Sequence, residues 1–262
     1  KQFRRLVDLA EETGIYLDLT GLASYRPADR AAWYDALDDA GRWKAQAAFW
    51  QAIARECKGR SAVFCYDLMN EPVSPPAKRD KWYSGNLLGE LDFVQLIAQD
   101  PAGRTRGEIA IEWIDELTTA IREEDRQTMI TVGLLPWGTK WKHLSGIVPK
   151  EIAPHVDFIS VHIYPNREQP EEAMQALREC DVGKPVVIEE TFPLKCSVEE
   201  LNAFLRSSRG IACGWMAHYD GQTVEEIDAL EKSGELTIAK AIWRSGLQSM
   251  SDLKPELTGA AE

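Results

Sequence analysis

The sequence lacks the features that mark several classes of protein. It contains no apolar run that approaches the roughly 20 residues of a membrane-spanning helix. Basic residues are in the minority, with 30 Lys and Arg against 42 Asp and Glu and a net charge of -12. Nucleic acids and anionic membranes bind clustered basic side chains. We therefore expect neither as a partner, and the sequence leaves the oligomeric state unknown.

Metal-binding and phosphate-binding motifs are also missing. The sequence has no glycine-rich turn of the kind that binds a dinucleotide. The five cysteines are odd in number and lack CxxC spacing, which argues against a zinc site and against a disulfide framework. The four histidines lack HxH or HExxH spacing: His143, His155, His162 and His218. We therefore expect no metal, no cofactor, and buried free thiols at the cysteines.

The sequence does contain an alternation of strand-like and helix-like segments. Apolar runs of strand length are separated mostly by helical patterns, and they lie at 15–19, 61–69, 129–135, 158–163, 185–188 and 210–215. Residues 73–107 are expected to form a long loop, and a last helix is expected at about 236–248. Strands that are apolar on both faces and alternate with helices predict an α/β fold with parallel strands.

The ends of the strands distinguish the two architectures that fit, a doubly wound open sheet and a closed barrel. Polar residues follow nearly every strand: Asp18 and Thr20, Asn70 and Glu71, Trp137, His162 and Tyr164, Glu189 and Glu190, His218 and Tyr219. A (β/α)8 TIM barrel carries its chemistry at these carboxyl ends. We therefore predict such a barrel with its first two strands absent from the chain. Residues 1–262 would form a single, N-terminally incomplete catalytic domain.

Two glutamates at strand ends suggest the chemistry. Glu71 follows one apolar run and precedes Pro72, and Glu190 ends another. Carboxylates at the end of a buried strand are costly unless the site uses or pairs them. Hydrolysis of a glycoside with retention needs a carboxylic acid and a carboxylate, roughly 5–5.5 Å apart. We predict that Glu71 and Glu190 form this pair, against the alternative of two salt-bridged surface glutamates.

The motifs around these glutamates resemble those of the cellulase-like glycoside hydrolases, family five, and their clan of barrels. Asn70-Glu71-Pro72 is similar to the acid/base signature at the end of the family's fourth strand. Residues 184–190 resemble the seventh strand, which ends in the nucleophile, and residues 161–164 resemble the sixth. Residues 15–19 and 214–217 resemble the third and the eighth. The resemblance covers nearly the whole chain.

The resemblance implies roles for the matching residues. Glu71 would be the general acid and then the base, and Asn70 would bind the 2-hydroxyl group of the sugar. Glu190 would be the nucleophile, Tyr164 would hold it through its hydroxyl group, and His162 would contact the wall of the site.

The last strand and two other positions depart from the family pattern. Trp215 and His218 are candidate substrate contacts, and His218 stands where the family usually has a Trp. Thr20 stands where the third strand usually ends in His, and Thr191-Phe192-Pro193 replaces an aromatic-Gly pair. These departures bear on the identity of the substrate more than on the type of reaction.

Six of the nine tryptophans fall into two groups. Trp50, Trp113 and Trp243 lie in helical stripes and are expected in the core. Three others follow strands in loops, where they are either platforms for apolar sugar faces or structural packing: Trp82, Trp137 and Trp141.

The adjacent glutamates 189 and 190 raise the question of which one attacks. Consecutive side chains of a strand point to opposite faces, so only one of the two is expected to enter the mouth of the barrel. We predict that this residue is Glu190 and that Glu189 faces the helices, unless a bulge reverses the alternation.

The sequence thus predicts a retaining O-glycosyl hydrolase that cleaves β-linked glycans, such as β-1,4-glucan or mannan, with an oligosaccharide or polysaccharide as its partner. The resemblance implies a secreted or periplasmic protein. The alternative is a non-hydrolytic barrel retained as a carbohydrate-binding or structural protein, and the departures at Thr20 and His218 keep it open.

Overall fold

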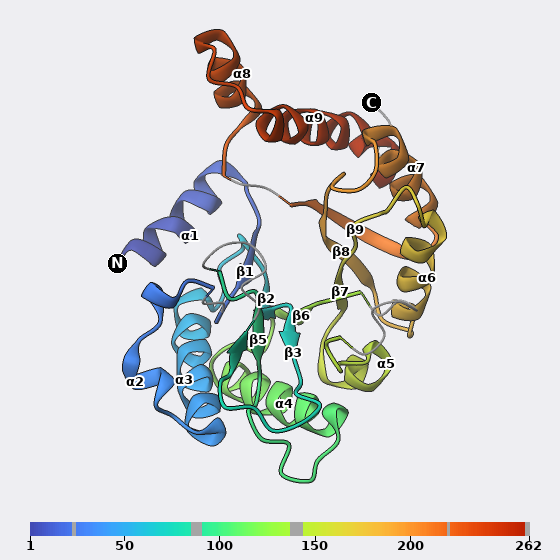
Figure 1. The fold of residues 1–262 in the computed structure, drawn as a ribbon. Helices are drawn as coiled ribbons and strands as arrows, with labels where there is room; N and C mark the ends of the chain where they lie inside the picture. The colour runs from blue at the N-terminus through green and yellow to red at the C-terminus, as the bar shows by residue number, and fades with distance from the viewer. Residues whose placement is uncertain (23–24, 85–90, 137–143, 219–220, 260–262) are drawn as a thin grey trace. The chain divides into compact units, whose positions relative to one another are not determined.

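The computed structural model describes residues 1–22, 25–84, 91–136, 144–218 and 221–259. The chain divides into two compact units, shown together in Figure 1. The first comprises Lys1–Leu135 and Lys142–Ile159, and the second comprises Pro136–Trp141 and Ser160–Glu262. Among the described residues, no helix has both the length and the apolar character needed to cross a bilayer.

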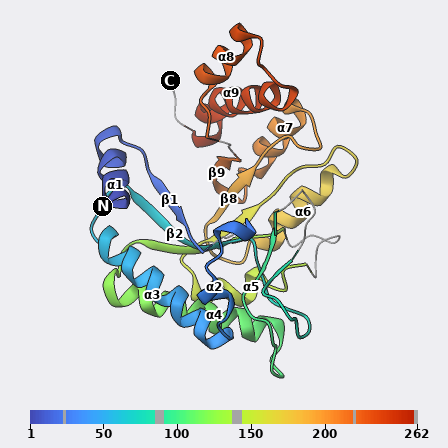
Figure 2. The ribbon, with the colours of Figure 1, turned by 60° about the vertical axis from the view of Figure 1, so that its left-hand side comes forward.

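The first unit is built on a parallel sheet. Its strands pair in the order β1 (Leu17–Thr20), β2 (Val63–Asn70) and β6 (Met129–Leu134). Two long helices, α3 (Asp39–Cys57) and α4 (Arg106–Glu124), lie side by side along this sheet (Figure 2). Trp50 and Trp113 on these helices are 1% and 0% exposed, as predicted for the core. β2 is buried along most of its length because it lies between two strands and under helices.

The first unit also contains shorter elements before, between and after these strands. They are α1 (Gln2–Thr13), η1 (Pro27–Asp29), α2 (Ala32–Asp35), α5 (Pro149–Ile152) and η2 (Ala153–His155). The segment expected as a long loop after β2 contains a small sheet of order β3-β5-β4, made of β3 (Pro72–Val73), β5 (Val94–Leu96) and β4 (Tyr83–Ser84). Strands of two or three residues are too short to leave a periodic pattern in the sequence, so the prediction missed them.

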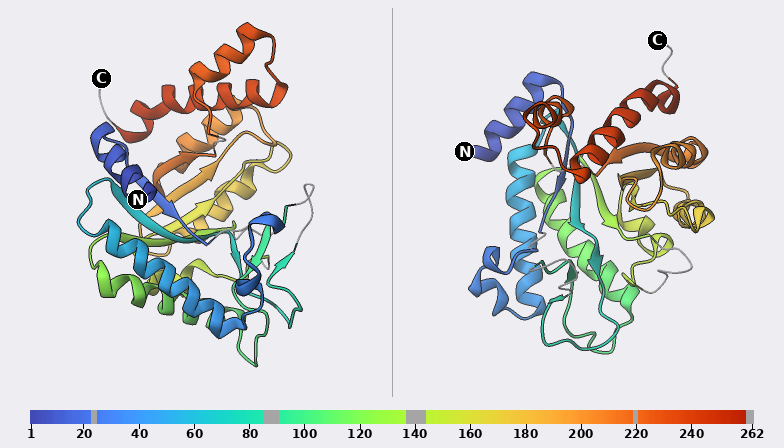
Figure 3. Two further views of the ribbon diagram at one scale, coloured as in Figure 1. Left: turned by 90° about the vertical axis from the view of Figure 1, so that its left-hand side faces the viewer. Right: turned by 45° about the horizontal axis from the view of Figure 1, so that its top comes forward.

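The second unit contains the later strands, β7 (Ile159–His162), β8 (Val186–Thr191) and β9 (Ala212–Ala217), in the order β7-β8-β9. Residue 159 at the start of β7 falls in the first unit. Helices α6 (Pro170–Cys180) and α7 (Val198–Ser208) lie next to each other along these strands (Figure 3). They are followed by α8 (Val224–Ser233) and α9 (Ile238–Thr258). Parallel strands alternating with helices confirm the predicted α/β class.

The cysteines are all free, as expected. Cys57, Cys65 and Cys180 are buried, and burial raises the pKa of the Cys57 thiol to about 11. The expectation of burial is wrong for Cys213, which is exposed and donates its thiol proton to the carbonyl oxygen of Val186 at 3.3 Å.

Asp125, at the C-terminal end of α4, ties this helix to β2 and to the loop before β6. It is 2% exposed and accepts hydrogen bonds from the Tyr66 hydroxyl group at 2.9 Å, the Thr128 hydroxyl group at 2.6 Å and the Gln127 amide at 2.9 Å. Burial by itself raises the pKa of Asp125, but these hydrogen bonds stabilise the carboxylate more, so the pKa is lowered.

The lowered pKa makes a prediction about stability. Because the folded state binds the Asp125 proton more weakly than the unfolded chain does, the ionised carboxylate stabilises the fold above the unfolded pKa of about 3.9. This contribution is lost as the pH falls through the lower, folded pKa. Asp125→Asn is expected to lower the free energy of unfolding by about 1–3 kcal/mol at pH 7. Urea unfolding at pH 7 and at pH 3 checks this, and a difference that does not shrink at the lower pH contradicts it.

Candidate active site

The first unit carries Asn70 and Glu71 at the end of β2. Asn70 pairs with Gly133 of β6, and the backbone amide of Glu71 donates to the carbonyl oxygen of Gly133 at 2.8 Å. Glu71 has a φ of 49°, in the left-handed region that side chains other than glycine rarely adopt. Strained backbone of this kind gathers at functional sites, where the surrounding structure must hold it. The strand pairing thus fixes the backbone of Glu71 at the strand end.

A residue that the sequence did not single out contacts Asn70. The Asn70 side-chain amide donates to the hydroxyl group of Tyr25. The Tyr25 carbonyl oxygen accepts from the Asp92 amide at 2.8 Å, and its ring lies 5.8 Å from that of Phe93. Tyr25 belongs to an irregular connection after β1, where periodicity gives no signal. It orients the Asn70 amide through contacts made far along the chain.

The second unit brings four of the predicted residues together. The Tyr164 hydroxyl group donates to the carboxylate of Glu190. His162 Nδ1 lies 3.6 Å from one oxygen of Glu190, and His218 Nε2 lies 3.8 Å from the other. These side chains come from the ends of β7, β8 and β9, which lie side by side in the sheet. The Glu190 side chain is 23% exposed, so its carboxylate is positioned by donors and still open to solvent.

Glu189 corrects the prediction from strand alternation. It was expected to face the helices, but Ser160 donates its hydroxyl proton to Glu189, and His162 Nε2 lies 3.4 Å from the same carboxylate oxygen. Ser160 and His162 are two residues apart on β7 and share a face. The register between β8 and β9 shifts between Ile188 and Thr191, which is the irregularity that turns both glutamates to one side.

Trp215 lies apart from this group. Its indole Nε1 donates to the hydroxyl group of Ser208 at 2.7 Å, and Ser208 is the last residue of α7. A Cβ atom built on the neighbouring Gly214 would lie 3.3 Å from the Val187 side chain. Since consecutive residues of a strand face opposite sides, Trp215 projects toward α7. The structure therefore separates it from the residues around Glu190.

Trp243 of α9 is a second residue whose place the sequence did not predict. It was expected in the core, but it is half-buried, with its ring 3.9 Å from that of Phe192 and 5.1 Å from that of His218. It lies beside a histidine that contacts Glu190. The apolar stripe of this helix predicted burial, and Trp243 is partly buried. The stripe could not predict which residues would pack against the helix.

The structure tests the prediction for only one of the three loop tryptophans. Trp82 is 4% exposed and donates its indole proton to Asp35 at 3.0 Å, which favours structural packing over a sugar platform. Trp137, a predicted substrate contact, and Trp141 lie outside the described residues.

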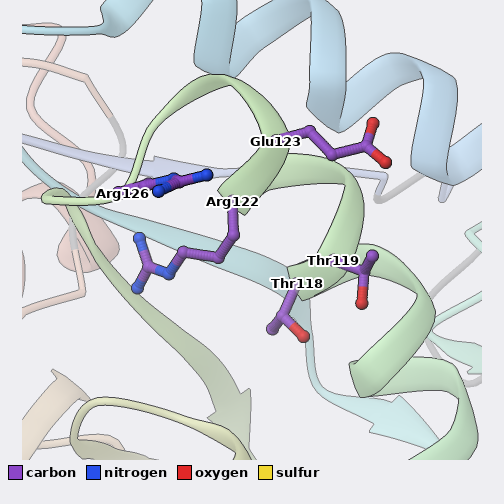
Figure 4. Close-up of a pocket in the computed structure, with 5 residues that line it drawn as sticks. All are labelled: Thr118, Thr119, Arg122, Glu123 and Arg126. Carbon is purple, nitrogen blue, oxygen red and sulfur yellow. The ribbon is translucent and has the colours of Figure 1, made fainter.

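A depression on the surface of α4 does not resemble a catalytic site. It is lined by four residues of the last turns of α4 and by Arg126, which follows the helix: Thr118, Thr119, Arg122, Glu123 and Arg126 (Figure 4). Arg122 donates to the Thr128 carbonyl oxygen and to Asp157, both at 2.6 Å. Its guanidinium group thus serves to hold the end of the helix.

Comparisons with known proteins agree with the fold. A search of curated proteins gives no match. An exo-β-1,4-mannosidase, Op5Man5, from Opitutaceae bacterium strain TAV5 is similar in structure, with a TM-score of 0.61, 18% identity and coverage of 99% of this chain. This chain spans about half of the mannosidase, 49% of its length.

Two further structures are similar over nearly the whole chain. The catalytic domain of Thermobifida fusca endoglucanase Cel5A has a TM-score of 0.58 and 18% identity, with 97% of this chain and 74% of that chain covered. A GH5_18 protein from Streptomyces cattleya, in complex with Manβ1-4GlcNAc, has a TM-score of 0.61 and 15% identity, with 99% and 67% covered. At these identities the likeness shows the fold, and it confirms the predicted (β/α)8 barrel type.

The family itself follows from the sequence match. The profile described as cellulase, glycosyl hydrolase family 5, matches residues 1–195, which is most of the chain. The chain therefore belongs to the cellulase family, glycosyl hydrolase family 5.

Proposed function

We propose that the protein hydrolyses β-linked glycans with retention of configuration, with Glu190 as the nucleophile and Glu71 as the acid/base. The observation that carries the proposal is the setting of Glu190. Tyr164 donates to its carboxylate, and two histidine nitrogens lie within 3.8 Å of it. A carboxylate held by donors and partly exposed can attack a carbon atom in a fixed direction.

The first chemical step forms an ester. An oxygen of Glu190 bonds to the anomeric carbon, the glycosidic bond breaks, and the leaving oxygen takes the proton of Glu71. In the second step a water molecule attacks the same carbon, Glu71 takes a proton from the water, and the bonding electrons return to Glu190 as a carboxylate. Two inversions give net retention.

The acid/base role of Glu71 is supported by the strand end that carries it. The bond from its amide to Gly133 and the left-handed backbone hold the residue in one place through both proton transfers. Asn70, whose amide also donates to Tyr25, would hydrogen-bond the 2-hydroxyl group of the sugar. Tyr25 would then set the direction of that amide.

A β-1,4-linked glucan or mannan is the proposed substrate class. Among structurally similar proteins are an exo-β-1,4-mannosidase and an endoglucanase. Another was determined with Manβ1-4GlcNAc, and the endoglucanase also with cellotetraose. Glucose and mannose differ at the 2-hydroxyl group, so the contact proposed for Asn70 bears on the choice between them.

Covalent labelling tests the proposal directly. A 2-deoxy-2-fluoro glycoside with an activated leaving group forms the ester quickly and hydrolyses it slowly. Mass spectrometry of the digested protein should place the label on Glu190, after a panel of β-glucosides, β-mannosides and the corresponding β-1,4 polymers has identified the sugar. A label on Glu189, or binding of these glycans without any hydrolysis, would overturn the proposal.

A further inference from the structure

We propose that Glu189 is a positioning residue that keeps His162 positively charged throughout the reaction, as a permanent counter-ion beside the nucleophile. The kinetic part of this inference rests on the proposed function, and the charge of His162 does not. The group concerned consists of Ser160, His162, Glu189 and Glu190, all in the second unit.

The contacts place one carboxylate at each nitrogen of the imidazole. His162 Nε2 lies 3.4 Å from Glu189, and Nδ1 lies 3.6 Å from Glu190. A neutral imidazole has one N–H group, so its other nitrogen would turn a lone pair toward a carboxylate. The protonated ring has a donor on both sides. The arrangement therefore assigns His162 the charged form.

Burial makes this arrangement sensitive to the loss of either anion. The His162 side chain is 2% exposed and that of Glu189 is 7% exposed. A charged group removed from water is stable only when it is paired, and otherwise it gives up its charge. Ser160 donates to Glu189 and holds its carboxylate in place.

The reaction removes one of the two anions. When Glu190 attacks the sugar it becomes a neutral ester, so its pairing with His162 is lost in the intermediate. Glu189 takes no part in bond formation and keeps its charge. With Glu189 present, the ring remains protonated and stabilises the Glu190 carboxylate as it leaves in the second step. Without it, the ring loses the charge of both of these carboxylates in the intermediate, and it binds its proton more weakly.

Among the described residues of the second unit, Tyr164 and His218 are two further ionisable groups that contact this cluster. Tyr164 lies on the same chain segment as His162 and donates to Glu190, and His218 lies past the end of β9, 3.8 Å from Glu190. Both contact the nucleophile, whereas Glu189 contacts His162. Removal of Glu189 should therefore act mainly on the second step, in which the carboxylate of Glu190 is released.

The kinetic test uses Glu189→Gln, which keeps the shape and removes the charge. With an aryl β-glycoside, we expect kcat to fall by roughly 10-fold to 100-fold, in line with losing the charged partner of a buried group. We expect kcat/KM, which reports the first step, to change less, and a burst of aryl alcohol equal to the enzyme concentration should appear. Glu189→Asp should restore part of kcat, and Glu225→Gln, with the same charge change on the exposed face of α8, should leave it unchanged.

Equal losses in kcat and kcat/KM for Glu189→Gln, without a burst, would overturn the proposal. Rescue of Glu189→Ala by azide would also overturn it, because azide replaces a missing nucleophile. Nuclear magnetic resonance of nitrogen-15-labelled histidine gives a test that does not need activity, with His162 assigned from a His162→Gln variant. The wild-type ring should be doubly protonated at pH 7, and a neutral ring would overturn the assignment. If the His162 ring is charged but the protein hydrolyses no glycoside, the proposed function is wrong and the assignment of the charge stands.

Discussion

Replacement of Glu190 by alanine is expected to lower kcat by on the order of 10⁴-fold to 10⁶-fold, since removing a nucleophile abolishes the covalent step. Tyr164, His162 and His218 would remain and would surround the space left by the carboxylate. Azide can occupy that space and attack the sugar from the same side. With an activated β-glycoside, added azide should therefore restore turnover and give an α-glycosyl azide, which proton magnetic resonance identifies.

The neighbouring glutamate provides the matched control. Glu189→Ala removes the same group one residue away, from a carboxylate that is 7% exposed and bonded to Ser160. We expect its remaining activity to be insensitive to azide. Rescue of the Glu189 variant together with no rescue of the Glu190 variant would exchange the two assignments.

Replacement of Glu71 by alanine is expected to produce the second largest effect, and the size should depend on the leaving group. Sugars and other poor leaving groups need a proton, so kcat/KM for a β-1,4 oligosaccharide should fall by about 10²-fold to 10⁴-fold. A dinitrophenyl glycoside leaves without a proton and should lose little in the first step. Steady-state rates for a series of aryl glycosides should show a steeper dependence on leaving-group pKa than the wild-type protein shows.

Azide again distinguishes the roles. In Glu71→Ala it can replace the water molecule that no longer has a base, and it should give a β-glycosyl azide with retained configuration. Glu71→Gln serves as the second variant, since it keeps the size of the side chain. Equal losses for oligosaccharides and for activated aryl glycosides would remove Glu71 from the acid role.

The strand ends were predictable from the sequence because apolar runs stop abruptly at polar residues there. Asn70 and Glu71 lie at the end of β2, and His162 and Glu190 lie at the ends of β7 and β8 as expected. Ser197 and Glu200 form a capping box at the start of α7, a pairing of residues three positions apart that can be recognised in the sequence alone. Such features depend on residues close together in the sequence, so they can be predicted without knowledge of the tertiary structure.

What the sequence could not predict depended on contacts between distant segments. The directions of the Glu189 and Trp215 side chains depend on the pairing of β8 with β9. The register shift in this pairing is not visible in the sequence of either strand alone. Tyr25 reaches Asn70 from an irregular connection, and Trp243 meets His218 from the last helix. In each case the residue type indicated which contacts the side chain could make, but tertiary packing determined which residue became its neighbour.

The left-handed backbone of Glu71 has a consequence for engineering and for evolution. A glycine would adopt a φ of 49° with no steric penalty, whereas Glu71 holds it against its own preference. Selection for thermal stability alone would therefore favour the loss of the very side chain proposed to donate the proton. A library screened only for heat resistance should be expected to enrich inactive sequences at this position, and activity must be kept in the screen to prevent that drift.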